Sequence, residues 1–146
     1  MNRLDAIPIQ VEDVGLPHRT ENLQPLMQQV EQALHELVEH GAETVIDLSS
    51  MPFSEQDEKD LRARLGAGEV NASVMAFGPT LVQESAFPGV WLVEHQNAEQ
   101  RRLTLQLVVA RVPEILMTPP DDLPDSLAAL RRANAESFDT PGKDVR

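Results

Sequence analysis

The stretches VWLVEH at residues 90–95 and LTLQLVV at residues 103–109 decide the fold of this chain. Both are rich in Val and Leu, and in the second stretch apolar residues alternate with Thr and Gln, which is the period-two pattern of a strand. A short polar loop at residues 97–99 separates them, so the pattern predicts an antiparallel hairpin. We expect one face of this hairpin to carry Trp91, Val93, Leu105 and Leu107.

Shorter extended segments lie upstream of the hairpin. Residues 44–48 read TVIDL, which is typical of a short buried strand, and residues 70–76 and 81–86 follow the alternating pattern. Pro88-Gly89 interrupts this pattern with a turn or a bulge. Together with the hairpin, these segments predict an antiparallel sheet of four or five strands.

Three segments have the period of an amphipathic helix, and they are residues 22–40, 54–65 and 121–138. Asn22 is the expected N-cap of the first helix, and Gly41 is expected to end it in a left-handed conformation. Ser54, with Asp57 three residues later, is a weak variant of the capping box. The fold class is therefore α+β, with the sheet packed on one side by about three helices.

The chain is expected to form one domain. Its 146 residues are an ordinary domain length, and no internal repeat or interdomain linker divides the sequence. Within this single domain over residues 1–146, residues 1–21 are expected to form an arm or an edge strand, because Pro8 removes a donor from any ladder. Residues 139–146 are polar and are expected to be a disordered tail.

The composition excludes several classes of function. The chain has no cysteine, which excludes disulfides, thiolate metal sites and thiol nucleophiles. The formal net charge of -12 repels nucleic-acid phosphates and anionic lipids, so neither nucleic acid nor membrane is an expected partner. The sequence contains no basic and apolar leader and no apolar run of about 18 residues. We therefore expect a cytoplasmic protein.

Metal and enzyme chemistry have little support in the sequence. His35 and Glu39 share a helix face, but zinc sites need three or four converging ligands, so we expect neither a metal nor another cofactor. Asp47, Glu84 and His95 supply two acids and a histidine without a nucleophile elbow or a phosphate-binding glycine loop. We expect no enzyme activity. A small-ligand-binding or catalytic domain that uses these three residues is the alternative.

Residues 84–95 are the most informative segment for function. They contain Phe87 and the sole tryptophan, Trp91, on either side of a Pro-Gly bend. An aromatic cluster beside a bend suits a docking surface for another protein. The core is an equally good place for Trp91. Phe87, which is next to the turn, is the better candidate for exposure.

Four groups of residues, in this order, resemble the C-terminal domain of the HupH/HyaF family. They are IDLSSMP at residues 46–52, GEVNA at residues 68–72, ESAFPGVWLVEH at residues 84–95 and VPEIL at residues 112–116. The resemblance covers residues 44–116. Family members often have a longer N-terminal region, and many have a second aromatic residue where Leu92 stands.

The family consists of accessory proteins for the expression and maturation of NiFe-hydrogenases. The resemblance implies a non-catalytic cytoplasmic helper that binds a hydrogenase subunit, above all the small subunit, or another maturation factor. It also marks Asp47, Glu69, Glu84 and His95 as motif positions for folding or docking. A homodimer that pairs through an exposed strand edge is a further alternative. We expect docking at Phe87, Pro88, Gly89, Val90, Trp91, Pro113, Glu114, Ile115 and Leu116.

Overall fold

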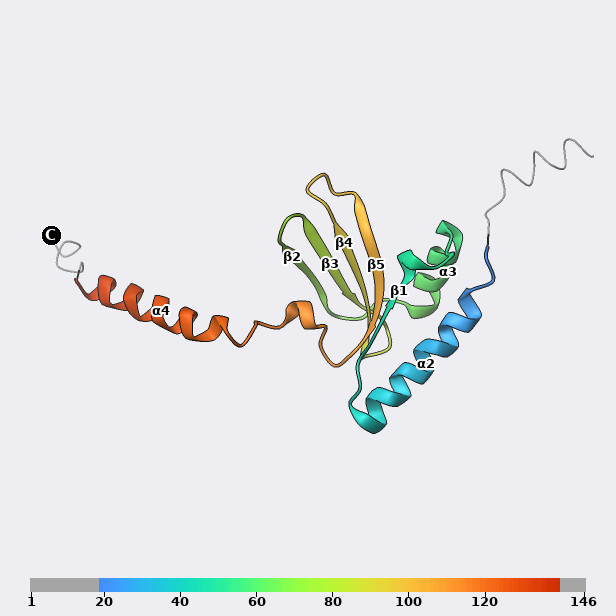
Figure 1. The fold of residues 1–146 in the computed structure, drawn as a ribbon, viewed down its shortest axis with the longest axis horizontal. Helices are drawn as coiled ribbons and strands as arrows, with labels where there is room; N and C mark the ends of the chain where they lie inside the picture. Colours follow the sequence, from blue (N-terminus) through green and yellow to red (C-terminus); the bar gives the residue numbers. More distant parts are fainter. Residues whose placement is uncertain (1–18, 140–146) are drawn as a thin grey trace, which may run out of the picture. The chain divides into compact units, whose positions relative to one another are not determined.

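The computed structural model describes residues 19–139 of the chain (Figure 1). Residues 140–146 of the predicted tail, and all but the last three residues of the arm predicted over residues 1–21, lie outside the described residues. Asp139, the first residue of the predicted tail, is instead the last residue of a helix. The chain divides into two compact units, Met1–Pro113 and Glu114–Arg146, and each is described by itself. The single domain over residues 1–146 stays a prediction.

The first unit contains a five-stranded antiparallel sheet, which confirms the predicted fold class. The two longest strands are the predicted hairpin, β4 and β5, and they lie side by side within the sheet. The shorter β1 and β2 form its two edges. The order across the sheet is β1 (Thr44–Asp47), β5 (Arg102–Val109), β4 (Val90–Gln96), β3 (Pro79–Glu84) and β2 (Asn71–Met75).

The register of the hairpin corrects one prediction. Leu92 pairs with Leu107, and Trp91 pairs with Val108. Directly opposed residues share a face, and successive side chains alternate between faces. Trp91 and Val93 therefore lie on the face opposite to Leu105 and Leu107, and the prediction that these four share a face was wrong. The loop and an irregularity between His95 and Gln96 set this register, and neither can be read from the periodicity of each strand.

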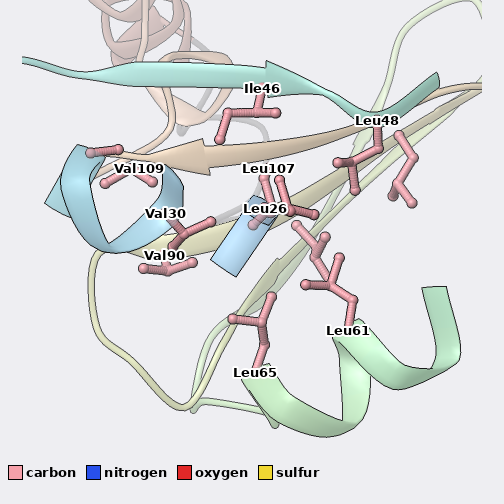
Figure 2. Packing of buried hydrophobic residues seen from close by; sticks show 12 residues of the cluster. Leu26, Val30, Ile46, Leu48, Leu61, Leu65, Val90, Leu107 and Val109 are labelled. Carbon is pink, nitrogen blue, oxygen red and sulfur yellow. The ribbon is translucent and has the colours of Figure 1, made fainter. Parts of the chain in front are cut away.

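The helices α2 (Leu23–His40) and α3 (Glu55–Leu65) cover the face that carries Leu105 and Leu107. Figure 2 shows side chains of both helices pointing toward those of β1, β4 and β5. Each fully buried Leu or Val of this kind contributes roughly 1.5–3 kcal/mol before the entropy cost is subtracted. The buried members of the core are Leu26, Val30, Ala33, Ile46, Leu48, Leu61, Leu65, Val90, Leu92, Leu105, Leu107 and Val109.

The helix ends follow the predictions with one exception. Gly41 ends α2 with a φ of 68°, and Ser54 and Asp57 form the capping box of α3. The Asp57 carboxylate also accepts hydrogen bonds from the N–H and the hydroxyl of Thr20, which tie the segment before α2 to α3. Asn22 is at the expected N-cap position, but its side chain donates to the Pro52 carbonyl 2.5 Å away and makes no cap hydrogen bond.

The second unit contains a 3-10 turn, η3 (Glu114–Leu116), and the helix α4 (Asp122–Asp139). The helix predicted over residues 121–138 is thus confirmed, and its packing on the sheet stays a prediction. Its apolar stripe of Leu123, Leu127 and Leu130 is exposed. Within residues 19–139, no helix combines the length and the apolar character that crossing a membrane requires.

Candidate functional site

A tight bend joins β3 to β4 and holds Phe87 at the surface. The Ser85 N–H donates to the Val90 carbonyl at 2.9 Å, and the Val90 N–H donates to the Phe87 carbonyl at 3.0 Å. The buried Ser85 hydroxyl accepts from the Phe87 N–H and donates to the Phe87 carbonyl. Gly89 has a φ of 97°, a conformation that other residues rarely adopt. The bend is therefore fixed by its own hydrogen bonds, and Phe87 stays 49% exposed.

An apolar pocket of about 260 Å³ lies between this bend and α2. Its apolar walls come from α2, from the last residue of α3 and from both sides of the bend. Polar side chains of α2 form the rest of the lining. The lining residues are Gln24, Met27, Gln28, Val30, Glu31, Leu34, Leu65, Phe87 and Val90.

A second, more open pocket continues along α2 beyond Leu34, which lines both pockets. Its apolar α2 wall includes Val38, which is 76% exposed. We call the two pockets together the α2 groove, which runs beside α2 from Gln24 to Gly41 and has the bend as its other wall. The second pocket is lined by Leu34, Leu37, Val38, Gly41, Glu43, Glu84, Pro88, Gly89 and Arg111.

The aromatic residues of the bend have different surroundings. Trp91 is buried, and its indole N–H donates to the Ala110 carbonyl at 3.0 Å. Val90 is buried as well, although it lines the floor of the first pocket. A partner can therefore reach Phe87, Pro88 and Gly89, whereas Trp91 supports the sheet beneath them.

The second predicted docking segment, Pro113–Leu116, is divided between the two units. Pro113 is buried at the end of the first unit. Glu114 and Ile115 are exposed and Leu116 is half-buried within η3 of the second unit. Docking at these residues stays a prediction, and they are not part of the α2 groove.

Glu84 binds the backbone of the motif that contains Gly68 and Glu69. Its carboxylate accepts from the N–H of Glu69 at 2.9 Å and from that of Val70 at 3.3 Å. The Gly68 N–H donates to the Glu84 carbonyl at 2.8 Å. A side chain at Gly68 would place its Cβ 2.4 Å from the Ser85 carbonyl oxygen, which is closer than real contacts allow. Gly68 and Glu84 thus serve folding in this structure.

The three residues of the alternative enzyme reading do not converge. Asp47 accepts from the Ser49 N–H at 2.9 Å, and His95 Nδ1 lies 3.0 Å from the Thr80 hydroxyl. Glu84 pairs with Trp91 and His95 pairs with Thr80, so Glu84 and His95 are four positions apart along the strands, about 13 Å. Asp47 lies on β1, two strands away from His95, about 10 Å across the sheet. The described residues contain no group of three or more His, Asp or Glu that could hold a metal ion.

A charged cluster joins α3 to the hairpin and lines a pocket between them. Arg102 donates to Glu58 at 2.6 and 2.8 Å and to Glu94 at 3.0 Å. Arg62 donates to Glu58 at 3.0 Å and lies 3.6 Å from Glu94. The pKa of Glu58 lies below its ordinary value, chiefly because of hydrogen bonds from Arg102. Burial alone would raise the pKa of Glu94, but hydrogen bonds from Gln96 and Arg102 outweigh it, and this pKa is also lowered. The two arginines, Arg62 and Arg102, thus pair with the two carboxylates, Glu58 and Glu94, within the chain.

The α2 wall of the groove was missed in the sequence. The amphipathic helix predicted over residues 22–40 was expected to pack its apolar residues on the sheet, yet Leu26 and Val30 are buried while Met27 and Leu34 are half-buried and Val38 is exposed. The available signal was the width of the stripe, which is greater than one packed face requires. The charged cluster was also missed, although the i,i+4 spacing of Glu58 and Arg62 was available as a signal for one of its pairs.

The sequence matches the family described as "HupH hydrogenase expression protein, C-terminal conserved region" over residues 20–136. This match extends the resemblance over residues 44–116 to include α2. The hydrogenase expression/formation protein HupQ of Azotobacter chroococcum mcd 1 is 31% identical over 80% of this chain and 42% of its own length. The hydrogenase-1 operon protein HyaF of Escherichia coli K12 is 25% identical over 66% of this chain and 35% of its own length.

A solved structure has a similar fold. The hydrogenase expression protein HupH from Thiobacillus denitrificans is 39% identical, with a TM-score of 0.77 over 82% of this chain and 99% of that chain. This chain spans less than half the length of the curated relatives: the match covers 42% of HupQ and 42% of HoxQ of Azotobacter vinelandii.

Proposed function

Because this chain belongs to the family of HupH hydrogenase expression proteins, we propose that it is a non-catalytic accessory protein of NiFe-hydrogenase maturation that binds a client through the α2 groove. The client is a hydrogenase subunit, with the small subunit as the first candidate, or another maturation factor. The proposed setting is the cytoplasm.

One observation carries the placement of the binding site. Phe87 is half-exposed beside a wall of half-buried apolar residues, and the bend that presents it is fixed by four hydrogen bonds. A pre-formed apolar concavity with an aromatic residue at its edge gains free energy when a partner excludes water from it. Little entropy is lost on binding when the presenting backbone is already ordered.

The non-catalytic role is supported by the local partners of the candidate acids and histidine. Glu84 binds backbone N–H groups, Asp47 caps the 3-10 turn η2 (Leu48–Ser50), and His95 contacts Thr80. These side chains are separated across the sheet, and the α2 groove itself contains Glu84 alone among the three. A reaction would need a nucleophile or base aimed at a shared point.

The placement is tested by affinity capture from a hydrogenase-expressing cell. The tagged chain is expected to recover the small subunit or a maturation factor, and the double variant Met27→Ala/Phe87→Ala is expected to lose at least about tenfold of it. The matched control is Phe77→Ala, because Phe77 is a fully exposed aromatic residue in the turn between β2 and β3. This control should recover the client as the parent chain does.

The outcomes separate the placement from the function. Equal recovery of the client by the parent chain and the double variant would show that the client does not bind in the α2 groove. A parent chain that recovers no hydrogenase subunit and no maturation factor would contradict the proposed function.

A further inference from the structure

We infer that the occupant of the α2 groove is a basic amphipathic helix of a partner protein, with apolar residues on one face and Lys or Arg beside them. This inference rests on the proposed function, because it names the chemistry of the client segment. Three features of the groove support it: the residue types of its walls, the position of its carboxylates and its length along α2.

The two main walls of the groove, α2 and the bend, are built from segments without Lys or Arg. No Lys or Arg occurs between Arg19 and Lys59, which includes all of α2, or between Arg64 and Arg101, which includes the bend. Acidic residues do occur in both segments. A cationic partner therefore meets no repulsion along most of the groove, whereas an acidic partner also faces the net charge of -12.

Glu31 and Glu43 are the carboxylates available to such a partner. Glu31 lines the first pocket and Glu43 lines the second, and both are exposed. Within residues 19–139, no ion pair engages either of them. Glu84 also lines the second pocket, but its carboxylate already binds two backbone N–H groups. Glu31 is thus the one charged residue among the described residues that line the first pocket, whereas Glu43 shares the second pocket with Arg111.

Two arginines mark the ends of the groove. Arg64 donates to Gln24 at 3.0 Å at one end, and Arg111 lines the second pocket at the other. Neither arginine lines the first pocket, which contains Glu31 near the middle of α2. The uncompensated negative charge of the groove is therefore that of Glu31, between its two ends, which favours a partner whose basic residues lie beside the central part of its apolar face.

The length and shape of the groove suit a helix. From Gln24 to Gly41 the wall rises about 25 Å at 1.5 Å per residue, which matches a partner helix of about 17 residues. Met27, Leu34 and Val38 form a ridge along one side of α2. A second helix packs its own ridge of apolar residues against such a surface. The long aliphatic stems of Lys and Arg can lie on the apolar rim while their charges reach the carboxylates.

The inference is tested with two designed helical peptides of about 17 residues that share the same Leu positions. One carries Lys beside the apolar face and the other carries Glu. Fluorescence anisotropy with the full chain is expected to show that the Lys peptide binds about tenfold more tightly at low salt. The difference should shrink as salt is added, because exposed charges are screened. Phe87→Ala should weaken binding of the Lys peptide.

Matched charge reversals locate the effect. Glu31→Arg and Glu43→Arg should each weaken binding of the Lys peptide by about threefold to fivefold, the size of one exposed ion pair. Glu99→Arg makes the same change in net charge in the loop at the opposite end of β4, roughly 20 Å from the bend. This control should bind the Lys peptide as the parent chain does.

Several results would overturn the inference. Equal affinity for both peptides, an equal loss in the Glu99→Arg control, or full binding by Phe87→Ala would each do so. If Met27→Ala/Phe87→Ala loses client capture but the peptides show no charge preference, the proposed function is supported and the basic helix is ruled out as the occupant. A dimer in light scattering that dissociates on Phe87→Ala, with no peptide binding, would assign the groove to a second copy of this chain.

Discussion

The helices α2 and α3 cover the same face of the sheet, but they expose different chemistry. Several charged side chains of α3 meet partners within the chain: Glu58 binds Arg62 and Arg102, and Asp60 binds Arg19 at 2.9 Å. The outer side of α2 carries half-buried and exposed apolar residues beside the bend. Groups that are satisfied within the chain stabilise its architecture. Groups that remain exposed to water mark where another molecule gains free energy by binding.

The largest effect is expected from the inner side of α3. Leu61 has no exposed surface, so Leu61→Ala should lower the free energy of unfolding by about 2–5 kcal/mol through lost burial and a cavity. Leu34→Ala, in the half-buried wall of the groove, should cost less than half as much. Urea denaturation followed by circular dichroism measures both. Equal costs would mean that the α2 wall is part of the core.

The second largest effect on stability is expected at Trp91, the buried aromatic residue beside the bend. Trp91→Phe removes the indole N–H and leaves the Ala110 carbonyl without its 3.0 Å donor in a buried site. We expect a loss of about 1–3 kcal/mol in the free energy of unfolding, since an unsatisfied buried acceptor pays its desolvation cost. Guanidinium denaturation monitored by far-UV circular dichroism measures it. A neutral effect would show that water or a neighbouring group replaces the indole.

The outcome for Trp91 also shows which parts of the structure were accessible to sequence reasoning. Alternating residues in β5 and the motif around the bend were sufficient for the hairpin and for the exposure of Phe87. The faces of Trp91 and Val93 were assigned wrongly, because a one-residue difference in register exchanges the two faces and each strand looks the same in either register.

The groove was only half predictable for a related reason. Met27 and Val30 follow the same helical period and both line the first pocket, but Val30 is buried and Met27 is half-buried. How far a neighbouring loop covers a helix depends on tertiary geometry and not on periodicity. The charged cluster likewise joins Glu58 and Arg102 across 44 positions in the sequence. Such long-range pairs leave no local pattern.

The third effect concerns the cluster at α3 and pH. Glu58 and Glu94 have lowered pKa values in the folded chain. Their contribution to stability is therefore complete above the ordinary carboxyl pKa and is lost as pH falls through the lowered values. Arg102→Met should cost about 1 kcal/mol at neutral pH and should reduce the loss of stability between about pH 5 and pH 3.

Arg101→Met is the matched control for this prediction. Arg101 is next to Arg102 in the sequence, its side chain is exposed, and no ion pair engages it within residues 19–139. Urea midpoints measured across the pH range give both slopes. The lowered pKa of Asp57 contributes equally to both variants and cancels in the comparison. If Arg102→Met and Arg101→Met show the same pH slope, the cluster does not hold the carboxyl pKa values down.

The smallest effect is expected at the exposed side of the bend. Phe87→Leu keeps an apolar side chain at a position that is 49% exposed, and it leaves the backbone hydrogen bonds of Ser85 and Gly89 in place. The free energy of unfolding should change by no more than about 0.5 kcal/mol, as for most surface substitutions. The same urea titration, run beside Trp91→Phe, measures it. If Phe87→Leu is as costly as Trp91→Phe, the Phe87 ring supports the core of the free chain. The bend then offers no surface that a partner can gain from covering, and the contrast between the two helices loses its functional meaning.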